Sequence, residues 1–126
     1  MILSKDFHTI NTSFDFYEGI ISKIFWTENF TDLLISVYYN YDTPKGLKDK
    51  EVIIRFKKCC KLTFDYTNML SSMKEFGIVT PHPEILEVAL IMEGEYIKAR
   101  ISTNYETSMI SLLCDEIWIE TADSNN

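Results

Sequence analysis

The chain has 126 residues, of which 46% are hydrophobic and 13% aromatic. This composition argues against disorder and is enough for the packed core of a single domain, residues 1–126. A formal net charge of −7 disfavours nucleic acid and anionic membrane surfaces as partners. Because no apolar run approaches the ~20 residues of a membrane span, and the N-terminal residues do not resemble a signal peptide, we expect a cytoplasmic protein.

The first part of the chain predicts a three-stranded antiparallel meander. Residues 1–13 are polar after Leu3, which indicates a short strand or a loosely ordered arm. Residues 20–26 are apolar on both faces, as in the centre of a sheet. Residues 31–41 alternate, and a turn at Pro44 and Gly46 leads to the third strand. The alternating apolar face of the second strand is Leu33, Ile35, Val37, Tyr39 and Tyr41.

Residues 52–66 form the longest alternating run, with apolar side chains at even positions as far as Tyr66. The run is longer than most strands, and Lys58 interrupts its apolar face. We therefore expect one bent strand, or two consecutive strands, with the break at residues 57–60. Cys60 falls on the expected core face, and Arg55, Lys57 and Lys61 form a basic strip on a solvated outer face.

After Tyr66 the spacing of apolar residues becomes helical, which predicts one short helix over about 67–76 that ends at Gly77. Residues 86–101 then predict a hairpin around Glu93 and Gly94. The expected register places Leu90 opposite Ile97 and Glu87 opposite Arg100. In the last strand the alternation slips by one position at residues 115–116, which indicates a bulge. Residues 121–126 predict a frayed tail.

The sequence contains no convincing catalytic, cofactor-binding or metal-binding set. Cys59 and Cys60 are adjacent and diverge in a strand, so they cannot easily share a metal. A nucleophilic pair of Cys114 with His82 is possible in principle, but buried structural thiols are far commoner. Asp115 and Glu116 also diverge, whereas acid–base catalysis needs two converging carboxyl groups.

What remains are residues suited to binding another protein. Tyr38, Tyr39 and Tyr41, which the first hairpin is expected to bring near Trp26, pack either in the core and its rim or in a protein-binding patch. The acidic C-terminal part, with candidate residues Asp115, Glu116 and Glu120, suits a basic partner.

Three stretches carry a resemblance to a known class of proteins. They are residues 14–24 (FDFYEGIISKI), 31–39 (TDLLISVYY) and 52–59 (VIIRFKKC). Together they resemble the small, acidic, β-rich immunity-type proteins of bacterial polymorphic toxin loci. The resemblance implies a protein without catalytic residues that neutralises a cognate toxin by binding it.

These observations predict a mainly β domain: an antiparallel sandwich or strongly bent sheet of about seven strands with one short helix, or alternatively an α+β roll. The leading functional hypothesis is a non-enzymatic, cytoplasmic protein-binding domain that neutralises a toxin. The alternatives are a β-barrel or sandwich that binds a small apolar ligand, favoured by an enclosed cavity of several hundred Å³, and a small enzyme.

Overall fold

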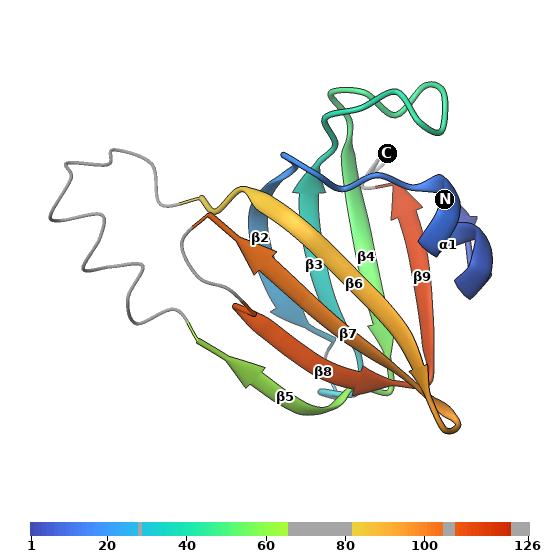
Figure 1. Ribbon diagram of the computed structural model, residues 1–126, viewed down its shortest axis with the longest axis vertical. Helices are drawn as coiled ribbons and strands as arrows, with labels where there is room; N and C mark the ends of the chain where they lie inside the picture. Colours follow the sequence, from blue (N-terminus) through green and yellow to red (C-terminus); the bar gives the residue numbers. More distant parts are fainter. Residues whose placement is uncertain (28, 66–81, 105–107, 122–126) are drawn as a thin grey trace, which may run out of the picture.

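The chain folds into two antiparallel sheets packed face to face around one hydrophobic core (Figure 1). The computed structural model describes residues 1–27, 29–65, 82–104 and 108–121. The five-stranded sheet has the order β1-β9-β4-β3-β2, and the four-stranded sheet has the order β5-β8-β7-β6. The strands are β1 (Ile2–Ser4), β2 (Ile20–Trp26), β3 (Leu33–Tyr38), β4 (Glu51–Lys57), β5 (Cys60–Phe64), β6 (Ile85–Glu93), β7 (Tyr96–Thr103), β8 (Ile110–Cys114) and β9 (Glu116–Thr121).

This architecture confirms the mainly β prediction, with nine strands in the described ranges rather than about seven. The core is built by the alternation that the sequence displays. Val52, Ile54 and Phe56 of β4 are all at most 1% exposed, as are Ile117 and Ile119 of β9. Both sheets contribute their inner faces to this core, so the molecule is a sandwich rather than a single bent sheet.

The meander β2-β3-β4 is confirmed, but the position expected for its first strand is wrong. The segment Ile20–Trp26 pairs with β3 on one side and is the edge strand of the five-stranded sheet. The place beside β4, on the side away from β3, is taken by β9. Its two apolar faces have different surroundings: Ile24 and Trp26 pack against the core, whereas Phe25 is 37% exposed.

Two bends carry the chain from one sheet to the other. Lys58, with a φ of 51°, separates β4 from β5, and Asp115 separates β8 from β9. The backbone N–H of Asp115 donates to the carbonyl of Lys57 at 2.9 Å, which joins the two bends. The predicted break at residues 57–60 is therefore confirmed. The bulge expected at residues 115–116 within one last strand is instead a break between two strands of different sheets. The left-handed residue resets the alternation, so Cys60 is exposed and Cys59 packs against the core, contrary to the expected core position of Cys60.

The hairpin β6–β7 is confirmed, but its register differs from the prediction by two residues. Glu93 pairs with Tyr96, so the two-residue loop is Gly94–Glu95, and Leu90 lies opposite Ala99. Gly94 occupies the first loop position with a φ of 66°, a conformation that suits glycine. The expected pair of Glu87 and Arg100 exists as a diagonal contact, with Arg100 Nη2 3.4 Å from Glu87 Oε1.

The N-terminal residues are folded, not a loose arm. β1 pairs with β9, and α1 (Phe7–Ser13) follows with Asp6 as its N-cap. Within the described residues α1 is the one helix; the predicted helix at 67–76, and residues 122–126 of the tail, lie outside them. Ile10 of α1 is 2% exposed and joins the core at the side of the sandwich between β9 and β6. No helix in the described ranges is long and apolar enough to cross a membrane.

Candidate functional site: the groove between β2 and β5

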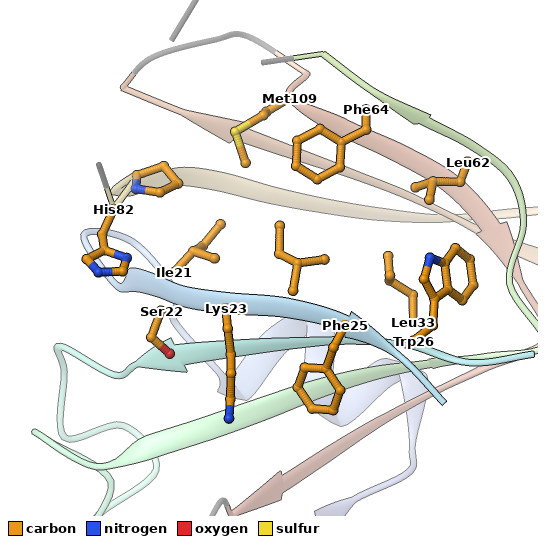
Figure 2. Close-up of a pocket in the computed structure, with 12 residues that line it drawn as sticks. Ile21, Ser22, Lys23, Phe25, Trp26, Leu33, Leu62, Phe64, His82 and Met109 are labelled. Carbon is orange, nitrogen blue, oxygen red and sulfur yellow. The ribbon is translucent and has the colours of Figure 1, made fainter. Parts of the chain in front are cut away.

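The opposite side of the sandwich, between the edge strands β2 and β5, carries an apolar groove of about 650 Å³ (Figure 2). The β2–β5 groove is open to solvent and mostly apolar in its lining. Its lining residues are Ile21, Ser22, Lys23, Ile24, Phe25, Trp26, Leu33, Leu62, Phe64, His82, Pro83 and Met109.

The local structure of β2 decides which of its side chains reach the groove. A register shift between Ile21 and Lys23 resets the alternation of this strand. As a result, Ile24 and Trp26 pack against the core. Figure 2 shows the Lys23 and Phe25 side chains on the outer face of the sheet. The groove therefore has apolar side chains from both sheets on its floor and the backbone of β2 along one rim.

The groove has the chemistry of a binding surface. Among its described lining residues, the side chains with a polar group are those of Ser22, Lys23, His82 and the Trp26 indole, and none is a carboxylate or a thiol. In Figure 2 the Ser22 and Lys23 side chains point away from the groove, and His82 lies at one end of it. These groups form no nucleophile–base arrangement, so the groove can bind by burying apolar surface.

The catalytic alternative raised by the sequence is not assembled. Cys114 lies opposite Ile97 at one end of β7, whereas His82 precedes Ile85, which lies opposite Thr103 at the other end. Six residues of strand separate these positions by about 20 Å. Burial raises the pKa of Cys114 to about 12, which disfavours the reactive thiolate. In the described part of the chain, no three His, Cys, Asp or Glu side chains form a group that could hold a metal ion.

The three candidate tyrosines have different environments. Tyr38 is 52% exposed, but Tyr39 is 1% exposed and belongs to the core, so it cannot contribute to a partner-binding surface. The Tyr39 hydroxyl donates to the carbonyl of Thr43 and accepts from the backbone N–H of Asp15, and burial raises its pKa to about 12. Tyr41 donates its hydroxyl to Glu18 Oε1 at 2.8 Å.

The acidic candidates do not join these tyrosines in one patch. Glu116 lies opposite Lys57, at the end of β4 remote from Glu51, which is opposite Tyr38. The length of β4 therefore separates Asp115 and Glu116 from Tyr38 by about 20 Å. Glu120 is nearer to Tyr38, because it lies opposite Ile53, but it is paired with Arg55. Trp26 pairs with Leu33 and is likewise at the end of the β2–β3 hairpin away from Tyr38, contrary to the expected proximity.

Ion pairs engage Glu120 and the basic residues Arg55 and Lys57 of β4. Arg55 Nε lies 2.9 Å from Glu120 Oε2, and Arg55 Nη1 lies 2.8 Å from Asp32 Oδ2. The Lys57 ammonium is 3.3 Å from the same Asp32 oxygen and 4.3 Å from the ring centroid of Trp118. Asp115 and Glu116 serve separate partners, Lys58 and the Trp118 indole N–H. The expected solvated strip is thus a half-buried layer of paired charges at Arg55 and Lys57.

Apart from Trp26 and His82, which the sequence suggested for other roles, the groove residues were not singled out in the sequence. The signal for them was the double apolar face of residues 20–26, which also fits a central strand. Only the strand order shows that one of these faces borders a groove at an open edge.

No protein-family model matches the chain, and no curated protein matches it in sequence. The solved structure of an uncharacterized protein from Neisseria gonorrhoeae is similar, with a TM-score of 0.55 and 17% sequence identity. The similarity covers 84% of this chain and 93% of that one. At this identity the likeness shows the fold: the chain shares the β-rich architecture of that structure.

Proposed function

We propose that this chain is a non-enzymatic protein-binding domain and that the β2–β5 groove is its binding site. The observation that carries the proposal is the apolar groove itself, which lies along a strand edge and has no catalytic arrangement among its described lining residues. Apolar anchors seated in a desolvated pocket supply most of the energy of a typical protein interface. Partner side chains that fill the groove would bury Ile24, Trp26 and Leu62 further.

The partner that we propose is a basic toxin, which the domain neutralises in the cytoplasm by binding. The resemblance of residues 14–24, 31–39 and 52–59 to immunity-type proteins supports this identity of the partner. The net charge of −7 on this chain supports a basic partner, because complementary charges accelerate the encounter of two proteins.

Co-expression with the product of the neighbouring gene tests the proposal. We expect the chain to restore growth against a toxic neighbour and to bind the purified neighbour in calorimetry. Phe64→Ser, which removes a groove wall that is 41% exposed, should weaken binding at least tenfold. Ile91→Ser, a matched loss of an exposed apolar side chain on β6, should leave binding unchanged. Absence of both rescue and binding would overturn the proposal.

A small apolar ligand is the second candidate occupant. The groove volume of about 650 Å³ lies within the range of roughly 300–1,000 Å³ that is typical of small-molecule sites. Its openness to solvent favours the protein partner over this alternative. Titration with dodecanoate, followed by tryptophan fluorescence in a Trp118→Phe background so that Trp26 is the reporter, separates the two. Saturable micromolar binding that Phe64→Ser abolishes would favour the small ligand.

A further inference from the structure

Among the described residues, partners for the outer edge of β2 are found only at its first two residues. Ile20 forms an isolated bridge with Glu84, and the backbone N–H of Ile21 donates to the carbonyl of Pro83 at 2.9 Å. From Ser22 to Trp26, none of the strands in the described ranges pairs with this edge, because β2 is the last strand of its sheet. Such an edge presents a row of backbone groups on which another strand can form.

We propose that the partner binds by adding an extended segment as a sixth strand alongside β2. This inference rests on the proposed function and specifies how the groove is used. Successive side chains of an added strand point to opposite faces of the sheet. Those beside Ile24 and Trp26 enter the groove toward Leu62 and Met109, and those beside Lys23 and Phe25 lie on the outer face (Figure 2). The segment therefore has apolar residues at alternate positions.

Lys23 defines the chemistry of an intervening position. Its side chain is exposed, is not within ion-pair distance of any acid in the described ranges, and lies 5.5 Å from the ring centroid of Phe25. Its charge acts at longer range on Glu51, whose pKa the hydrogen bond from Ser36 and this charge both lower. A lysine on an edge strand opposes pairing with arbitrary strands, whereas a carboxylate directly opposite it on the added strand stabilises the pair. The open edge thus selects a segment with Asp or Glu beside Lys23, between two apolar residues. One acidic residue in the added strand is compatible with a partner whose overall charge is basic.

An array of synthetic heptapeptides tests the inference on the full-length chain. The peptides carry Val or Ile at alternate positions, with Asp, Ala or Lys at the central intervening position, and scrambled peptides of the same composition serve as controls. We expect binding only with alternation, and a preference of about fivefold for Asp over Ala. Lys23→Glu should transfer the preference to the Lys peptide, whereas Lys98→Glu, on an exposed position of β7, should not.

The outcomes separate this inference from the function beneath it. If the toxic neighbour binds in a Phe64-dependent manner, but the peptides show no need for alternation or no response to Lys23→Glu, strand addition is overturned and the binding function stands. Self-association that the peptides reverse would identify a second copy as the occupant of this edge, and would also overturn the inference. If neither the neighbour nor any peptide binds, both proposals fail.

Discussion

Asp32 is the most heavily engaged acidic residue on the outer face of the five-stranded sheet. Its side chain is 6% exposed, and its carboxylate contacts Arg55, Lys57 and the backbone N–H of Lys58. Burial by itself raises the pKa of this carboxyl, but the hydrogen bonds from Lys58, Arg55 and Lys57 together outweigh burial and hold the pKa below its ordinary value.

Replacing Asp32 should therefore destabilise the fold. Asp32→Asn leaves Arg55 and Lys57 without their shared counter-charge, and we expect a loss of about 2 kcal/mol in the free energy of unfolding. Urea denaturation at pH 7 measures it. Asp115→Asn is the control, because Asp115 lies 3.9 Å from Lys58 in an exposed pair, and its loss should be below about 0.5 kcal/mol. Equal losses would contradict this account.

The same residue predicts a pH dependence. Since the folded-state pKa of Asp32 lies below the unfolded value of about 3.9, its stabilisation is present above that value and is lost as pH falls through the folded pKa. Glu51 acts in the same direction, because hydrogen bonds from Ser36 and Ser22 lower its pKa. Unfolding free energy should fall on acidification below about pH 4, with a shallower slope in Asp32→Asn; parallel slopes would count against the assignment.

The three thiols should differ sharply in reactivity. Cys60 is exposed, whereas burial raises the pKa of Cys59 to about 11 and that of Cys114 to about 12. Since the thiolate is the reactive form, iodoacetamide at pH 8 should modify Cys60 first, with Cys59 and Cys114 slower by more than tenfold. Peptide mass spectrometry of the time course measures this order. Rapid modification of Cys114 in the native state would contradict the burial described above.

Among the elements, the bend between β4 and β5 depends on one backbone conformation. Lys58 has a φ of 51°, a region in which β-branched side chains are strained and glycine is not. Backbone bonds on both sides hold this bend, from Cys59 N–H to the Thr31 carbonyl at 2.8 Å and from Asp115 N–H to the Lys57 carbonyl at 2.9 Å. The chain therefore cannot relax a strained residue here by straightening.

This geometry predicts opposite outcomes for two substitutions at the bend. Lys58→Val should lower the free energy of unfolding by about 1–2 kcal/mol, while Lys58→Gly should leave it unchanged or raise it. Thermal and urea unfolding measure both. Lys98→Val controls for loss of a surface lysine, because Lys98 is exposed in an ordinary strand, and should change stability by less than about 0.5 kcal/mol. A similar loss in the glycine and valine variants would contradict the role of φ.

The hairpin β6–β7 shows what alternation can and cannot determine at this scale. A shift of the register by two residues leaves every side chain on the same face, so the pattern predicts that Leu90, Ile97, Ala99 and Ile101 face the core in either register. Their burial confirms this, whereas Leu86 and Met92, which the alternation places on the same face as Leu90, are 44% and 52% exposed. The choice between the two registers depends on the loop, where Gly94 takes the first position. The hydrophobic pattern cannot distinguish the two registers.

At the scale of the whole molecule, the two sides of the sandwich where the sheets end differ: one is covered by a helix and the other carries a groove. α1 covers the side between β9 and β6 with Ile10, which is 2% exposed, and the opposite side carries the β2–β5 groove. Ile10→Ala should cost about 2–4 kcal/mol, because a cavity would open in the core. Asn11→Ala, on the exposed face of the same helix, should cost less than about 0.5 kcal/mol. Calorimetric unfolding tests both; a negligible effect of Ile10→Ala would mean that the N-terminal segment is dispensable.

The sequence by itself determined the composition of the core and the class of the fold. Period-two alternation specifies which side chains of β4 and β9 are buried, and a break in it marks each of the two bends, because side-chain direction in a strand is a local property. In β3 it does not, because Leu34 and Ser36 of the other face are buried too. The sequence pattern could not predict the helix at Phe7–Ser13. This helix has only about two turns, and the packing of Ile10 chiefly stabilises it.

Only the tertiary structure decided which strands meet and which edges stay open. The placement of β2 at an edge, the insertion of β9 beside β4 and the pairing of Arg55 with Asp32 and Glu120 all join residues distant in the chain. The β2–β5 groove exists because two such edges face one another across the open side of the sandwich. The sequence could not identify the lining residues as groove residues, since an apolar side chain gives the same sequence pattern in a filled core as on the floor of a groove.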